Sequence, residues 1–280
     1  MQFRNYTYYL VDCVNGSDSN DGIIKPFQSL DKVFSVNQGN DLRIKFLSPG
    51  IYPTAAQHFS GLSMHWDGLT AGGDVIVDFC GKYPGKRIQF YNCYTHLKDV
   101  RFAWDPANQL YFECGYATIG NGAAFLSDVV RFNGMFMFAE NASFYRLIVR
   151  ESVAKLHNIT ITKSGDDPEN AIHSRDSFLT LYGTCMIQQK MRDKNYAAII
   201  QADRGRLYIS TAPTEETGYG CGIRTGNTEL YSAKKYLDMF DMNTLYGNSI
   251  STPASYREQV LEQRVTALEK AVKELKKVKT

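Results

Sequence analysis

The chain has 280 residues, enough for one large domain or two small ones with a sizeable buried core. Its formal net charge is only +2 and the charges are well mixed, which excludes the basic stripe typical of a nucleic-acid-binding protein. No apolar run is long enough to cross a bilayer, and the first residues lack the order of a signal peptide. We therefore expect that the protein is made in a cytoplasm and does not insert into a membrane. The 18 tyrosines and 16 phenylalanines favour strands, and the 22 glycines favour turns.

Residues 1–50 divide into a strand, a turn, a short helix and a second strand. Tyr8–Val14 is apolar and β-prone, Asn15–Gly22 consists of turn formers, and Pro26–Phe34 carries apolar residues at helical spacing. Arg43–Leu47 then reads as a strand that ends in a Pro-Gly turn. This order predicts one short amphipathic helix between two strands.

The same opening resembles right-handed parallel β-helix proteins of the phage tailspike and pectate-lyase-like group. The resemblance rests on V-D-x-x-N-G-S-D-S-N-D-G from Val11, Pro-Phe-x-Ser-Leu at 26–30, and Pro-Gly-x-Tyr at 49–52. In that family the short helix caps the open end of the solenoid, which would otherwise expose core and unpaired strand edge. The resemblance therefore implies an all-β fold, a right-handed single-stranded parallel β-helix with an N-terminal capping helix. It carries no catalytic residue.

Residues 51–231 are expected to form the body of this β-helix. Short β-prone runs follow one another, separated by Gly, Asn, Asp and Lys, and no helix of ordinary length is predicted. From position 75 onward the runs are Val75–Phe79, Ile88–Tyr91, Val100–Trp104, Leu110–Glu113, Val129–Phe132, Phe144–Val149, Leu156–Thr162, Phe178–Leu181, Ala197–Gln201, Leu207–Ser210 and Gly222–Thr225. By themselves these runs leave a sandwich, a barrel, a propeller or a β-helix open.

Two local signals separate the solenoid from its main rival. Asn121-Gly122 and Asn133-Gly134 are hairpin signals that favour an antiparallel sandwich. The phrase Leu97–Phe102, in contrast, returns in Leu126–Phe132 and more loosely in Leu156–Ile161, as a solenoid requires. We favour the solenoid, with roughly 20 to 25 residues per coil and about seven coils.

The last segments are expected to be a junction, residues 232–255, and a coiled-coil helix, residues 256–280. Pro253 blocks helix propagation from upstream, and Ser255 is a suitable N-cap for the closing helix. Five apolar residues then recur at alternating steps of four and three, the spacing that keeps one seam toward a partner helix. They are Leu261, Val265, Leu268, Val272 and Leu275. The alternative, an amphipathic helix lying on the chain's own core, normally shows a broader apolar stripe.

A trimer is predicted from a second resemblance. The segment from Arg264 to Glu269 resembles the Arg-apolar-x-x-apolar-Glu trimerisation signature of known coiled coils. There the arginine stem covers a leucine of the seam while its fork meets the glutamate of the next chain. The seam residues alone leave the choice open, because Val alternating with Leu is tolerated by dimers too.

Chemistry-bearing residues give weaker signals. Cleavage of a glycosidic bond usually takes two carboxylates, roughly 5 to 10 Å apart. The candidates are Asp166, Asp167, Glu169, Asp176 and Asp203, with Glu113, Asp105 and Asp128 as further acids. Acids two apart on a strand or one coil apart share a face of a β-helix, so the pattern is unspecific and no catalytic residue is assigned.

No metal site or cofactor is predicted. The Asp18–Gly22 run departs from the calcium-loop spacing and reads as a turn. The six cysteines form no C-x-x-C pair, and buried free thiols are expected.

Aromatic residues are too numerous for all of them to lie inside a narrow solenoid. Sugars stack on flat aromatic faces, so Trp104, beside Asp105, and Tyr94 are the predicted glycan contacts. The alternative is that the exposed aromatic residues pack between chains of a trimer.

The resemblance implies a homotrimeric phage tail spike or fibre, a receptor-binding protein that attaches to host cell-surface polysaccharide. Its expected partners are further copies of itself, the host glycan and other virion proteins. It would be made in the bacterial cytoplasm and lie in the virion. Two alternatives stay open: a polysaccharide depolymerase, either glycoside hydrolase or lyase, and a purely structural virion fibre or connector. Because no adaptor domain precedes the β-helix, unlike in long depolymerase spikes, we expect attachment without cleavage.

We predict that removal of residues 256–280 lowers the native mass of the particle from that of a trimer to that of a monomer. Light scattering of the full chain and of the truncated chain measures this directly. Alanine at both Arg264 and Glu269 should loosen the choice of three chains and leave the fold of each chain intact. A monomeric full chain would contradict the self-association prediction.

Overall fold

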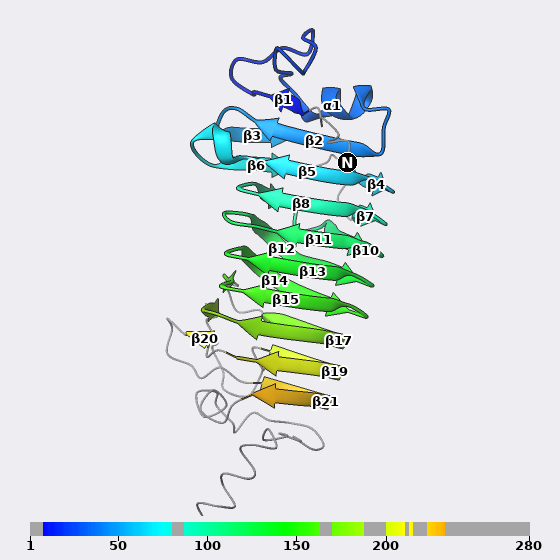
Figure 1. Cartoon of the computed structure of the whole chain (residues 1–280), viewed down its shortest axis with the longest axis vertical. Helices are drawn as coiled ribbons and strands as arrows, with labels where there is room; N and C mark the ends of the chain where they lie inside the picture. Colours follow the sequence, from blue (N-terminus) through cyan, green and yellow to red (C-terminus); the bar gives the residue numbers. More distant parts are fainter. Residues whose placement is uncertain are drawn as a thin grey trace, which may run out of the picture.

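The computed structural model describes residues 8–79, 87–162, 170–187, 200–210, 213–214 and 223–232. In this part the chain is almost entirely β-strand, and its strands belong to one sheet. The strands lie one below another along the long axis of the molecule (Figure 1). The predicted coiled coil, 256–280, lies outside the described residues, and so does the predicted junction apart from Ser232.

The N-terminal half contains the only described α-helix and the first nine strands. These elements are β1 (Tyr9–Val11), α1 (Leu30–Val36), β2 (Asp41–Phe46), β3 (Gly50–Pro53), β4 (His58–Ser60), β5 (Ser63–Asp67), the 3-10 turn η1 (Leu69–Ala71), β6 (Val75–Asp78), β7 (Arg87–Tyr91), β8 (Tyr94–Lys98) and β9 (Arg101–Ala103). The remaining strands are β10 (Gln109–Glu113), β11 (Tyr116–Ile119), β12 (Ala124–Asn133), β13 (Phe136–Glu140), β14 (Ser143–Arg150), β15 (Val153–His157), β16 (Thr160–Ile161), β17 (Ile172–Tyr182), β18 (Cys185–Ile187), β19 (Ile200–Ile209), β20 (Pro213–Thr214) and β21 (Ile223–Ser232).

The strands form three stacks, which we call the first, second and third faces. The first face contains β1, β2, β5, β8, β11, β13, β15 and the second halves of β17, β19 and β21. The second face contains β3, β6, β9, the first halves of β12 and β14, and β16, β18 and β20. The third face contains β4, β7, β10, the second halves of β12 and β14, and the first halves of β17, β19 and β21.

Each described pairing between these strands is parallel, and each joins one coil to the next. A sandwich built from hairpins is therefore excluded for the described part, and the arrangement fits the parallel β-helix class. The Asn-Gly pairs at 121–122 and 133–134 lie at bends between parallel strands, where Gly122 and Gly134 have positive φ.

The coils differ in length. Phe136 pairs with Val153 one coil later, whereas Ser63 pairs with Tyr94, so some coils are shorter and others longer than the predicted 20 to 25 residues. The predicted strand runs overlap observed strands wherever the structure describes them. Strands β8 and β11 were missed because they place Thr95 and Ala117 inside and tyrosines outside, which blurs the apolar alternation.

Inward-facing side chains stack on their equivalents in the neighbouring coils. The ring of Phe112 lies between Phe90, with centroids 4.6 Å apart, and Phe132, 4.9 Å away, and the three planes are nearly parallel. Phe125 and Phe144 stack in the same way at 5.2 Å. The parallel register therefore turns one buried position per coil into a continuous aromatic core.

A polar corner separates the first face from the second. Asp99, Asn141 and Asn158 occupy it with φ near +50°, a conformation that short polar side chains tolerate, and Asn121-Gly122 takes this place in the coil between Asp99 and Asn141. The side chain of Asn141 donates to Asn121 Oδ1 at 2.6 Å, and Asn158 Oδ1 accepts from the Thr184 amide at 2.8 Å. These side chains connect each turn to the turn of the next coil.

This corner explains the repeated phrase of the sequence and corrects one of its members. Leu97–Phe102 and Leu156–Ile161 both cross the corner, with the acid or amide residue at the same place. Leu126–Phe132 instead lies within β12, where the register shifts, and it is not equivalent to them. Ala139–Phe144, which crosses the corner at Asn141, takes its place.

The predicted turn at residues 15–22 is confirmed, and it anchors the first helix. Asp18 accepts hydrogen bonds from the amides of Gln28 and Ser29, and Ser29 caps α1 by accepting from the Lys32 amide. Hydrogen bonds from the amides of Lys25, Ile23 and Ile24 lower the pKa of Asp21.

The sequence predicted a helix that begins at Pro26, but the observed helix begins at Leu30. The residues before Leu30 pair with the first strand instead. Phe27 bridges Val11 and exchanges backbone hydrogen bonds with Leu10 and Asp12. Leu30 and Val33 of α1 are buried, and the helix lies beside β1 and β2 at one end of the stack (Figure 1).

We predict that Phe112→Ala lowers the free energy of unfolding by about 3–5 kcal/mol, because it leaves a cavity between two stacked rings. The exposed apolar residue Leu126 offers a matched control, and Leu126→Ala should change stability by less than about 1 kcal/mol. Denaturant unfolding of the full chain measures both values. Equal effects of the two substitutions would contradict the stacked core.

Candidate functional site

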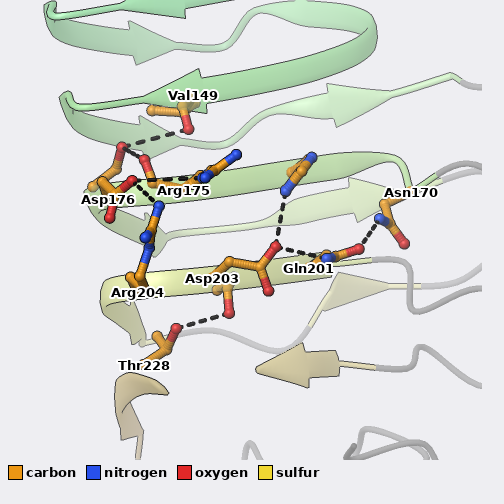
Figure 2. Close-up of polar contacts among 11 residues, drawn as sticks. Val149, Asn170, Arg175, Asp176, Gln201, Asp203, Arg204 and Thr228 are labelled. Atoms are coloured by element: carbon orange, nitrogen blue, oxygen red, sulfur yellow. Dashed lines mark hydrogen bonds and ion pairs between the residues drawn. The ribbon is translucent and has the colours of Figure 1, made fainter. Parts of the chain in front are cut away.

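Two groups of polar side chains lie on the third face, where β17 and β19 run side by side. Their register places His173 beside Gln201 and Arg175 beside Asp203. Because inward residues alternate with these, all four side chains point away from the core. Figure 2 shows Asn170, Gln201 and Asp203 in one group, and Arg175, Asp176 and Arg204 in another.

The first group is centred on the carboxylate of Asp203. Its Oδ2 atom lies 3.1 Å from His173 Nε2 and accepts a hydrogen bond of 2.6 Å from Gln201 Nε2. Gln201 Oε1 in turn accepts a hydrogen bond of 2.6 Å from Asn170 Nδ2. The side chains are half-buried, so the network is fixed by the protein and still reaches the surface.

The second group is centred on Asp176, at the corner where the third face meets the first. Its φ of +51° is left-handed, and its Oδ2 atom lies 2.7 Å from Arg204 Nη2 and 3.6 Å from Arg175 Nε. Asp203 and Asp176 thus have different partners: His173 and Gln201 for Asp203, and two arginines for Asp176. No described contact joins the two carboxylates or gives them a common partner of the kind that sets up acid and base roles.

The other three predicted acids, Asp166, Asp167 and Glu169, lie outside the described residues. The structure describes the chain again from Asn170, which belongs to the Asp203 group. Sequence reasoning selected the acids and missed Asn170 and Gln201. The signal that identifies Gln201 is its outward place in the alternation of β19, next to buried Ile200 and Ala202.

A second polar cluster lies several coils away on the same face. The guanidinium of Arg87 lies 3.7 Å from the ring centre of Tyr111, and Arg131 lies 5.3 Å from it on the next coil. Glu113 accepts from Arg87, from Gln89 and, at 3.2 Å, from Asn133. Glu113, a further acid of the sequence analysis, is therefore already held by three donors.

Register joins the two clusters. Glu113 pairs with Asn133, and the same outward position continues through Arg150 and Arg175 to Asp203. We call this series of residues the polar ladder. Each of its five members carries a charged or amide group, and neighbouring members are about 4.8 Å apart, the spacing of adjacent strands.

The predicted glycan contacts fall in three different places. Trp104 is 2% exposed, so the prediction that its ring stacks on a sugar is wrong, because the ring is part of the core. Asp105 is half-exposed and accepts a hydrogen bond from the Ala107 amide in a turn. Tyr94 is 45% exposed, but it lies on the first face, away from the polar ladder.

Two histidines lie side by side on neighbouring strands of the first face, His65 on β5 and His96 on β8. The ring centres of His65 and His96 are 5.4 Å apart, and His96 Nδ1 lies 2.7 Å from Thr118 Oγ1. Burial lowers the pKa of His65, and the nearby charges of Arg43 and His96 lower it further. Burial also lowers the pKa of His96, against the opposing effect of Asp67. Both rings are therefore neutral at pH 7.

The predictions about metal sites, membrane spans and cysteines can be compared with the structure only for the described residues. Among the described residues no three His, Cys, Asp or Glu side chains form a group that could hold a metal ion. No described helix has the length and apolar character of a membrane span. Cys93 and Cys185 are buried free thiols as predicted, whereas Cys114 is exposed at a corner, and positions 80 and 221 lie outside the described residues.

Comparison of the chain with protein-family models, with curated proteins and with solved structures gave no match. The fold class therefore rests on the strand register described above.

We predict that the free energy of unfolding falls as the pH drops below about 6.5, the ordinary pKa of histidine. Because burial lowers the pKa of His65 and His96 in the folded state, the unfolded chain takes up protons first, and acid favours unfolding. Denaturant unfolding at pH 7.5 and pH 5.5 measures the loss. The double variant His65→Gln/His96→Gln should show a smaller loss over this interval, and an unchanged loss would contradict the assignment.

Proposed function

We propose that this chain is a homotrimeric attachment protein of a phage tail, a spike or fibre whose β-helix body binds host surface polysaccharide. The observation that carries the binding proposal is the polar ladder, Glu113, Asn133, Arg150, Arg175 and Asp203. It presents carboxylate, amide and guanidinium groups in an unbroken series of five coils.

The chemistry of the ladder suits a hydroxyl-rich polymer. Carboxylates accept hydrogen bonds from sugar hydroxyls, guanidinium groups donate to them, and amides do both. Gln201 and His173, beside the ladder, add an amide and an imidazole that are already oriented by Asp203. Side chains held in place lose little conformational freedom when a ligand binds, which favours affinity.

The finer architecture of the proposal extends the described fold at both ends. The solenoid is right-handed, and α1 caps its N-terminal end by covering the core with Leu30 and Val33. The heptad seam of residues 256–280 joins three parallel copies. Three identical bodies raise the effective concentration of sugar-binding surfaces, so that weak contacts add to firm attachment.

Attachment without cleavage is favoured over depolymerisation by the partners of the acids. A glycosidase normally needs one carboxyl group that stays protonated near neutral pH and a second one that is ionised. Asp203 lies against His173 and Gln201, and Asp176 against two arginines, so the two carboxylates belong to separate groups of contacts and are not set as a facing acid and base (Figure 2). The ladder also favours a ligand-binding body over a purely structural connector.

We predict that Gln201→Ala and Asp203→Asn each abolish or strongly weaken binding of the full chain to an array of bacterial surface polysaccharides. Gln201→Ala removes a donor to Asp203 and a ligand-facing amide, and Asp203→Asn removes the charge that orients His173. Asp74→Asn is the matched control, because Asp74 pairs with Arg101 at 2.6 Å on the second face. It should bind like the unchanged chain.

Two results would contradict the proposal. Absence of binding to any glycan by the unchanged chain would favour the structural connector. Release of reducing ends from a bound polysaccharide, lost in Asp203→Asn, would identify a depolymerase.

A further inference from the structure

The first face exposes a column of aromatic rings that the polar ladder does not account for. Register places Tyr94 beside Tyr116, Tyr116 beside Phe136, and Phe136 beside Val153, which pairs with Phe178. We call these five residues the aromatic column. Phe136 is 61% exposed and Phe178 is 49% exposed. With strands about 4.8 Å apart, the column runs for about 20 Å along the solenoid.

The next series of outward positions is mixed, because exposed Lys155 and half-buried Thr180 lie in register between Phe138 and Tyr208. Phe138, one outward position further along β13, is half-buried, and Tyr208 on β19 is exposed. At the coils of Tyr116, Phe136 and Phe178 the third face carries the polar ladder, whereas at the coil of Tyr94 it exposes Tyr91. A column of exposed aromatic rings of this kind marks an interaction surface.

The orientation of the rings argues against a sugar as the occupant. Tyr94 and Tyr116 stack at 5.1 Å with planes only 6° apart, so the two rings cover each other's faces. Sugars stack on ring faces and need polar groups nearby to fix their hydroxyls. Phe136 and Phe178 offer no hydrogen-bonding atom. The column instead resembles the apolar centre of a protein interface.

We infer that the occupant is a second copy of this chain, so that the aromatic column is the contact between the bodies of the assembly. The inference rests on the self-association proposed above, and it names the surface that self-association uses. The heptad seam at 256–280 predicts parallel copies in register. In such an assembly, the same coil of every copy lies at the same height along the common axis. The aromatic column runs along that axis, so it contacts the aromatic column of the neighbouring copy over its whole length.

Site-specific photocrosslinking of the full chain tests this contact. Phe136 is replaced by the photocrosslinker p-benzoylphenylalanine in one protein, and Ile51 in the control. Ile51 is a matched position, because it is 60% exposed and lies on the second face. The native mass of both proteins is measured before irradiation. We expect chain-to-chain crosslinks from position 136 and none from position 51.

A second variant gives an independent measurement. Phe136→Asp/Phe178→Asp should raise the concentration at which the particle dissociates at least about tenfold, since central aromatic residues dominate interface energies. Ile51→Asp should leave that concentration unchanged. Because both substitutions fall on exposed side chains, each monomer should keep its fold, which circular dichroism verifies.

The outcomes separate this inference from the proposed function. An oligomeric particle that crosslinks equally from both positions, or from neither, overturns the inference and leaves the trimer standing. A monomeric full chain overturns both. Loss of polysaccharide binding in Phe136→Asp/Phe178→Asp with an unchanged dissociation concentration overturns the inference and assigns the aromatic column to the glycan.

Discussion

The structure depends on the parallel register between successive coils. A parallel ladder sets each residue beside the equivalent residue of the next coil, so any property of one position becomes a column along the molecule. Inside, this produces the stacked rings of Phe90, Phe112 and Phe132. At the corner it produces the series of Asp99, Asn141 and Asn158. The residue type at one position is therefore restricted by the equivalent residues of the two adjacent coils, because their side chains are in contact.

Register also explains why the faces of one solenoid differ so strongly. The third face carries the polar ladder, in which Asn133 donates to Glu113 and Arg150 lies beside Arg175. The first face carries the aromatic column, in which the rings of Tyr94 and Tyr116 stack. Ring stacking lowers the free energy of the aromatic series, whereas the ladder residues take most of their contacts from side chains beside the ladder, such as Arg87 and Gln89 on Glu113 and Gln201 on Asp203. Each face therefore offers one kind of chemistry over many coils, which suits a long or repeated partner.

The sequence predicted what is local and missed what depends on register. The opening turn and helix, and strands with clean alternation such as β10, were predictable because their signals lie within a few residues. The strands with which they pair could not be predicted, because the number of residues per coil varies. Phe136 pairs with Val153, whereas Ser63 pairs with Tyr94, a much longer step along the chain. This variation explains why Leu126–Phe132 was mistaken for a repeat. Trp104 was misplaced for a related reason: its neighbour Asp105 suggested a surface, yet the inward step of the chain falls on the tryptophan.

The two columns together constrain how copies of the chain can be arranged. If the aromatic column of Phe136 and Phe178 faces the axis of the assembly, the third face of each copy turns away from that axis, since the two faces belong to different sides of the same coil. The polar ladder then stays open to solvent in every copy. An arrangement that buried the ladder would have to remove the charges of Arg150, Arg175 and Asp203 from water, at a cost that aromatic contacts do not carry. For the proposed assembly, the charge distribution thus favours one packing, with aromatic rings inside and hydrogen-bonding groups outside, on the side that the proposed polysaccharide would contact.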